Sequence, residues 1–155
     1  MNFSLEIGPH TDLDTLPEVK DVYVTMLPGG DYKETADKSG DLVKRGFNPV
    51  PHFPARSIGN EEDLKDYVSR CKDLGVKQIL AIGGSREPIG KFDSSYQILE
   101  TGLFDGIKIG IAGHPEGSPD ISDSELEKAM IDKKPYADYI AVSYTHLTLP
   151  TKRIV

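Results

Sequence analysis

The chain has 155 residues, of which 37% are hydrophobic and 28% charged, a balance that is ordinary for a globular domain. Its net charge of −7 argues against nucleic acid or an anionic membrane as a partner, and no apolar run approaches the ~20 residues of a membrane-spanning helix. The start of the chain lacks the charged and apolar regions of a signal peptide, and one cysteine, Cys71, permits no internal disulfide. These features predict a soluble cytoplasmic domain.

The first half of the chain alternates between strand-like and helix-like segments. Each strand-like run ends in a turn of glycine, proline or polar residues. The strand at 48–52 is weak because its two prolines cannot donate to a ladder, and we retain it because its spacing matches the other units. The expected elements are a strand over 3–7, a short helix over 11–20, a strand over 22–25, a helix over 32–45 that Gly46 ends, and the strand over 48–52.

The second half contains the clearest helix, over about residues 60–74. Its apolar residues Leu64, Tyr67, Cys71 and Leu74 recur at the spacing of one helix face, which predicts that this face packs on a core. A buried Cys71 is therefore favoured over a reactive one. The remaining expected elements are a strand over 76–82, a helix over 94–101, a strand over 108–112, a helix over 124–134 and a strand that begins at 139–142.

Strand and helix therefore alternate at the spacing of βα units in a parallel sheet. Two architectures share this pattern, an open doubly wound sheet and a (β/α)8 barrel, and the barrel typically needs ~250 residues. Length alone favours the open sheet. In both architectures ligands bind where the strands end, and the segment 110–121, rich in glycine and proline, is the most prominent turn of this kind.

Five short motifs occur in order along the chain. They are Phe3–Glu6 with Pro9, Val24-Thr25, Pro51-His52, Ala81–Gly84, and Ala112–Glu116 with Pro119. Together they resemble the N-terminal part of the methylenetetrahydrofolate reductase family, flavin enzymes built on a (β/α)8 barrel. Pro51–Arg56 with Gly83-Gly84 is most similar to a divergent branch of reductase-like paralogues. The resemblance covers about residues 1–141 and implies a TIM barrel truncated after about five and a half βα units.

Residues 142–155 have no counterpart in that family, and the composition changes abruptly after Val142. The segment resembles a translated sequencing adapter. We therefore expect a non-native tail here, and we assign His146 to no site.

The resemblance implies a flavin-dependent oxidoreductase of folate one-carbon metabolism that reduces 5,10-methylenetetrahydrofolate to 5-methyltetrahydrofolate. FAD would relay hydride from NAD(P)H to the folate, and the intact parent would be a homo-oligomer. The truncated chain itself is expected to be inactive. Glu6 would be the catalytic acid, and the cofactor-binding positions would be Thr25, His52, Ile82, Gly84, Ser85, His114 and Glu116.

The residues themselves support some of these roles. Glu6 lies among Phe3, Leu5 and Ile7, which suggests an enclosed carboxyl group with a raised pKa, as a general acid needs; the alternative is a surface glutamate on an edge strand. Gly83-Gly84 would let backbone N–H groups approach a phosphate, although such a pair is common in turns.

Other positions leave alternatives open. His52 is either a flavin contact or a structural histidine, and Arg56 could bind a phosphate or carboxylate with two hydrogen bonds. His114 stands where the family carries a tyrosine, and Ser85 stands where the well-known reductases carry an aspartate. Gly83 and Ser85 thus make a flavin- or folate-binding paralogue without reductase activity an alternative. A small α/β domain of unknown activity is another. The histidines lack the spacing of metal ligands, so no metal site is expected.

Overall fold

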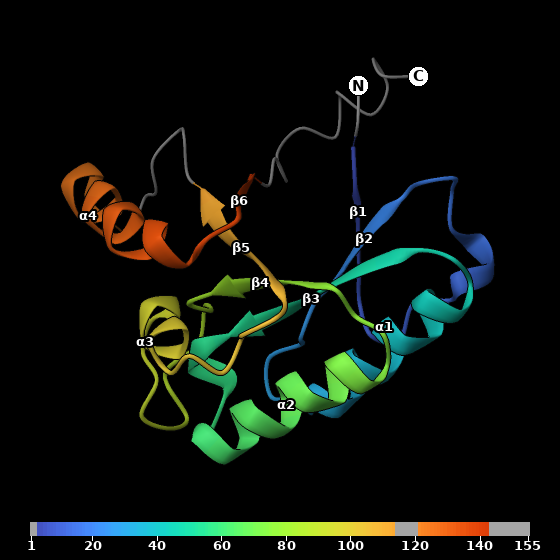
Figure 1. Cartoon of the computed structure of the whole chain (residues 1–155), viewed down its shortest axis with the longest axis horizontal. Coiled ribbons are helices and arrows are strands. Elements are labelled where there is room, and N and C mark those ends of the chain that lie inside the picture. The colour runs from blue at the N-terminus through green and yellow to red at the C-terminus, as the bar shows by residue number, and fades with distance from the viewer. Residues whose placement is uncertain (1–2, 114–120, 143–155) are drawn as a thin grey trace.

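A computed structural model describes residues 3–113 and 121–142 and shows six parallel strands in one curled sheet (Figure 1). Each strand pairs with the next one along the chain, in the order β1-β2-β3-β4-β5-β6. This sequential order is that of a (β/α)8 barrel and lacks the reversal of a doubly wound sheet. The strands are β1 (Leu5–Ile7), β2 (Asp21–Val24), β3 (Asn48–Pro54), β4 (Gln78–Ile82), β5 (Lys108–Gly113) and β6 (Tyr139–Val142).

The sheet is therefore a curled half-barrel, which confirms the barrel predicted from the resemblance and corrects the open sheet that length favoured. The predicted tail after residue 142 lies outside the described residues and stays a prediction.

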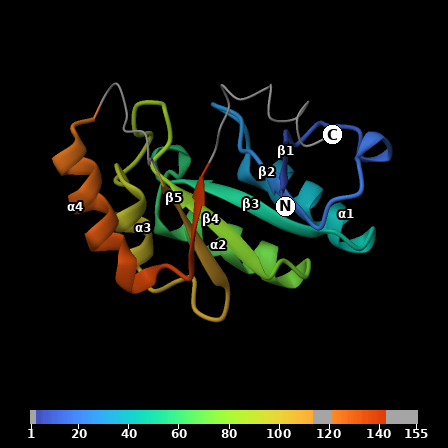
Figure 2. The ribbon, with the colours of Figure 1, turned by 90° about the horizontal axis from the view of Figure 1, so that it is seen from above.

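Four α-helices connect the described strands and lie around the outside of the sheet (Figure 2). The predicted helices over 32–45, 60–74, 94–101 and 124–134 are confirmed to within about two residues at each end. The predicted helix over 11–20 is wrong, because only one 3-10 turn forms there before the chain becomes extended at Leu16, next to Pro17. The elements are η1 (Leu13–Thr15), α1 (Tyr32–Lys44), η2 (Ala55–Ser57), α2 (Glu61–Asp73), α3 (Ser95–Glu100), α4 (Asp123–Lys133) and η3 (Lys134–Tyr136).

Side chains cap the starts of the longer helices. Asp31 accepts a hydrogen bond from the Lys33 amide, and Asn60 accepts one from the Asp63 amide at 2.8 Å. These caps satisfy amides that have no partner within the helix, which explains why helix positions could be predicted from the sequence.

Pro49 and Pro51 of β3 lie before the point at which β3 begins to pair with β4. Residues 48–51 of β3 pair with β2, whereas pairing with β4 covers residues 52–54. Pro49 and Pro51 thus lie before the β4 ladder begins, so their missing N–H groups cost no hydrogen bond on that side. Pairing with β4 extends the strand to a third proline, Pro54, two residues beyond its predicted end.

The main hydrophobic core lies between the sheet and helices α2 and α3. Phe53 of β3 stacks on Tyr67 of α2 with ring centroids 3.8 Å apart, and Phe104 packs edge-on against Phe53. Tyr67 is fully buried, and its hydroxyl donates a hydrogen bond to the backbone carbonyl of His52 at 2.8 Å. Cys71 is also buried, as predicted. The core therefore holds β3 firmly at His52.

No helix in the described parts of the chain is long and apolar enough to cross a membrane.

The hydrogen bond from Tyr67 gives a first test of this packing. Tyr67→Phe leaves the His52 carbonyl without its buried donor and should lower the free energy of unfolding by about 1–2 kcal/mol. Urea denaturation measures the change, with Tyr136→Phe, at a tyrosine on the surface, as the matched control that should stay near the wild-type value. Equal stability of Tyr67→Phe and wild type would contradict a structural role for this bond.

Candidate functional site

Side chains of each strand alternate between the helices and the concave face of the curled sheet. Val22 and Val24 pack on the helix side with Leu42 of α1, so Tyr23 between them faces the concave side. Phe53 likewise packs against α2 and directs its neighbour His52 to the concave side. By strand register the concave face carries Glu6, Tyr23, His52, Gln78, Gly110 and Tyr139.

Glu6 of β1 and His52 of β3 meet on this face. The Glu6 Oε2 and His52 Nε2 atoms are 3.8 Å apart, which is too long for a direct hydrogen bond. The His52 side chain is 10% exposed, while that of Glu6 is 52% exposed. The enclosed setting predicted for Glu6 is therefore wrong, because β1 is an edge strand of the described sheet and leaves the carboxylate open to solvent.

Burial sets the protonation state of His52. Desolvation lowers the pKa of the imidazole to about 4, so the ring is neutral at neutral pH. Its Nε2 atom is buried and has no hydrogen-bond partner among the described residues. A buried nitrogen without a partner costs free energy, and such groups are concentrated where function requires them.

Two tyrosines, Tyr23 and Tyr139, also lie on the concave face. The Tyr23 ring lies edge-on to His52, with centroids 6.1 Å apart and an interplanar angle of 71°. The Tyr139 hydroxyl accepts a hydrogen bond from Gln78 Nε2 at 3.4 Å and donates to the Ile79 carbonyl at 3.4 Å. Burial raises the pKa of both tyrosines, so both remain protonated donors at neutral pH.

The other predicted site positions follow the carboxyl ends of β2 and β4. The Thr25 hydroxyl donates to the Ile7 carbonyl at 3.3 Å and so ties β2 to β1. Ile82 ends β4 and is followed by Gly84, whose φ of +97° suits only glycine, and by the exposed Ser85. The structure does not test whether these residues bind a ligand. His114 and Glu116 lie outside the described residues.

The Arg56 side chain is hydrogen-bonded to Asp93 within the chain. Its Nε atom donates to the Asp93 backbone carbonyl at 2.9 Å and to the Asp93 carboxylate at 3.0 Å. These bonds hold the guanidinium against the segment before α3, which argues against the bidentate ligand contact considered from the sequence.

The residues that could hold a metal do not cluster in the described part of the chain. No group of three or more histidine, cysteine, aspartate or glutamate side chains is placed to bind an ion there.

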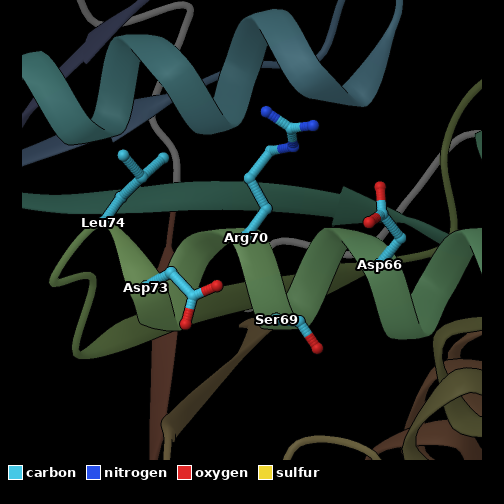
Figure 3. Close-up of a pocket in the computed structure, with 5 residues that line it drawn as sticks. All are labelled: Asp66, Ser69, Arg70, Asp73 and Leu74. Carbon is cyan, nitrogen blue, oxygen red and sulfur yellow. The ribbon is translucent and has the colours of Figure 1, made fainter.

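A pocket on the outside of α2 is a second place to consider (Figure 3). Arg70 and Leu74 point from α2 toward the neighbouring helix, and Arg70 Nη1 lies 3.5 Å from Asp37 Oδ1 of α1. The lining residues come from α2 and from Leu74, which follows it, and not from the strand ends at which barrels bind ligands. They are Asp66, Ser69, Arg70, Asp73 and Leu74. We therefore place the candidate site on the concave face.

Sequence reasoning missed Tyr23, Gln78 and Tyr139. Gly110 was a signal for Tyr139 in the sequence, because a glycine inside a strand often marks the close approach of another side chain, and the Tyr139 ring lies against Gly110. Tyr23 could have been found from the alternation of Val22 and Val24, which turns the residue between them to the opposite face.

Comparison with solved structures supports the fold. The chain is similar to a structure described as QR15, an aldolase, with a TM-score of 0.52 and 16% identity over 88% of this chain and 62% of that one. It also resembles an archaeal fructose 1,6-bisphosphate aldolase, with a TM-score of 0.49 and 17% identity over 81% of this chain and 50% of that one. A third similar structure is the YdjI aldolase from Escherichia coli K12, with a TM-score of 0.48 and 14% identity over 88% of this chain and 49% of that one. No family model matches the chain. The chain thus spans less than two thirds of these proteins.

These comparisons correct the function expected from the sequence. The structure that the chain matches with a TM-score above 0.5 is described as an aldolase, whereas the five motifs suggested a methylenetetrahydrofolate reductase. The predicted family, the flavin-dependent folate reduction and the cofactors FAD and NAD(P)H are therefore wrong. The physical reason is that Gly/Pro turns after strands are required by barrels in general, so short motifs at these turns do not separate one barrel family from another. The expectations about partners and oligomeric state remain predictions.

The burial of His52 predicts how stability depends on pH. Between the folded-state pKa of about 4 and the ordinary value of 6.5, the unfolded chain binds more protons than the folded one. The free energy of unfolding should therefore fall as pH drops through this window, with His52 contributing about 3 kcal/mol at most. Urea denaturation at a series of pH values measures the loss.

The variant His52→Gln isolates this contribution from that of the carboxylates. It should show a weaker dependence on pH than wild type, while His10→Gln, at a solvent-exposed histidine, should behave like wild type. Identical pH dependence in wild type and His52→Gln would show that His52 is not buried as described.

Proposed function

We propose that this chain is part of a (β/α)8-barrel enzyme that acts on a small carbonyl compound and catalyses the enolisation step of an aldol reaction. The observation that carries the proposal is the pairing of a solvent-accessible carboxylate, Glu6, with a buried neutral imidazole, His52, on the concave face. The shared fold with a structure described as an aldolase supports the reaction class, and the pair supplies the chemistry.

The two side chains suit different steps. In enolisation a base removes a proton from the carbon next to the carbonyl, and the electron pair of that C–H bond moves onto the carbonyl oxygen. The Glu6 carboxylate would accept the proton and later return it. The neutral His52 would donate its Nε2–H to the oxygen as negative charge develops there. A carboxylate base beside a neutral imidazole is an established way to run this step at neutral pH.

The geometry of the pair is compatible with these roles. The α-carbon and the carbonyl oxygen of a substrate are separated by two bonds, so the groups that act on them must lie side by side. Glu6 and His52 do so at 3.8 Å. The Nε2 atom is buried and has no partner among the described residues, so a substrate oxygen would bind it once the side chains that cover it move aside. Tyr23 adds a protonated hydroxyl on the same face. We infer that this face holds the reacting atoms.

Exchange of carbon-bound hydrogen for deuterium tests the proposal. Incubated in D₂O with dihydroxyacetone, the smallest ketose, the chain should exchange the α-hydrogens faster than buffer does, as followed by proton NMR. Glu6→Gln removes the base and should slow the protein-dependent rate by about 10²-fold or more. His52→Leu should also slow it strongly, whereas His52→Gln keeps an N–H donor and should retain part of the rate.

The chain offers a matched control for the glutamate. Glu34 lies 3.5 Å from His10, but both side chains of this pair are exposed on the surface. Glu34→Gln should therefore exchange at the wild-type rate. The resemblance led us to expect an inactive truncated chain, but Glu6 and His52 both lie among the described residues, so the proposal predicts exchange by this chain itself. The proposal fails if the folded wild-type chain exchanges no faster than buffer, or if Glu6→Gln and Glu34→Gln have the same rate.

A further inference from the structure

The Nε2 atom of His52, to which the proposed function assigns a substrate oxygen, is closed off from solvent. It is buried and has no hydrogen-bond partner among the described residues. The His52 side chain as a whole is 10% exposed. A substrate therefore reaches this atom only after a neighbouring side chain has moved, and the surroundings of the imidazole indicate which one.

The neighbours of His52 on its own strand and on β4 are packed in place. Val50 lies two residues earlier on β3, and Leu80 of β4 pairs with His52 in register, so both share its concave face. Val50 is fully buried and Leu80 is 7% exposed. Side chains in a close-packed interior have little room to move, so these two stay where they are.

The neighbours on β1 and β2 are open to solvent on one side. Glu6 and Tyr23 pair in register, and both face His52. Glu6 Oε2 lies 3.8 Å from Nε2, and the Tyr23 ring lies edge-on to the imidazole with centroids 6.1 Å apart. They are the titratable groups that face His52 from these strands, whereas Val50 and Leu80 carry no charge.

Of these two neighbours, Tyr23 is the one that can keep water away. The Glu6 side chain is 52% exposed, and a solvated carboxylate brings water with it. The Tyr23 ring is large, mostly apolar and only partly buried. Its backbone is fixed, because Val22 and Val24 on either side are fully buried on the opposite face. The ring can therefore turn about its side-chain torsions while β2 stays in place.

We propose that Tyr23 controls access to His52: its ring covers the imidazole and turns aside before a carbonyl oxygen can bind at Nε2. The importance of this cover for catalysis rests on the function proposed above, but the covering of His52 does not. Tyr23 thus acts as a positioning residue, which keeps water away from the imidazole until a substrate takes the place of the ring.

Chemical modification with diethyl pyrocarbonate tests the cover without any turnover. The reagent acylates neutral imidazole nitrogens that it can reach, and mass spectrometry of proteolytic peptides follows His52 and His10 separately. His10 is 67% exposed and serves as the internal reference. In the wild-type chain His52 should react at least about tenfold more slowly than His10, because the uncovered state is a minor one.

Variants at position 23 show whether the ring is the cover. Tyr23→Ala removes the ring and should raise the rate of His52 modification by about tenfold or more, toward that of His10. Tyr23→Phe keeps the ring and should react at the wild-type rate. Tyr23→Leu keeps an apolar side chain but no ring, so it should raise the rate less than alanine does. The leucine variant carries the test if the alanine variant does not fold.

Two truncations elsewhere separate the cover from its alternatives. Val24→Ala loosens β2 from its opposite face and leaves the Tyr23 ring in place, and Glu6→Ala removes the other neighbour of Nε2. Both should raise the His52 rate much less than Tyr23→Ala does. The proposal is overturned if either raises it as much, if wild-type His52 reacts as fast as His10, or if Tyr23→Ala and Tyr23→Leu react at the wild-type rate. The expected modification rates together with an absence of hydrogen exchange would refute the proposed function alone.

Discussion

The curl of the parallel sheet is the constraint on which the concave site depends. Tyr23 on β2 and Tyr139 on β6 are separated by three intervening strands. In a flat sheet, four strand spacings would place their backbones about 19 Å apart, too far for the side chains to meet. The sheet instead bends through part of a barrel, so that both residues face one concave space (Figure 2). The same bend turns Glu6 and His52 toward a common space.

The two faces of β3 connect stability with chemistry. On the helix side, Phe53 stacks on Tyr67, and the Tyr67 hydroxyl binds the His52 carbonyl. On the concave side the His52 imidazole is buried, neutral and without a partner at Nε2 among the described residues. The apolar core therefore holds the backbone at the position where the inner face carries an unsatisfied polar group. The stability of the core thus offsets the free energy that the buried imidazole costs, and the imidazole stays available to a substrate.

Much of the fold could be predicted from the sequence, because helix caps, terminal glycines and apolar stripes act locally. The helix at 60–74 was predicted from its apolar stripe, and in the structure the Asn60 side chain caps its start. The curl could not be predicted from such patterns, since strand spacing is the same in an open sheet and in a barrel. His52 and Glu6 were identified as candidates, but their setting was not: Glu6 is exposed and His52 is buried. Tyr139 was missed because its contacts join residues 60 or more positions apart.

The most direct test of the curled sheet is the distance between Tyr23 on β2 and Tyr139 on β6, which both face the concave side. With the tyrosine rings selectively labelled and assigned from single Tyr→Phe variants, a nuclear Overhauser cross-peak between these two rings would place β2 and β6 together across the concave face. We expect that cross-peak in the folded wild-type chain, and its loss in Tyr139→Ala. Absence of the cross-peak, together with a spin-label distance between positions 23 and 139 close to the flat-sheet value of about 19 Å, would contradict the curled sheet and the site built on it.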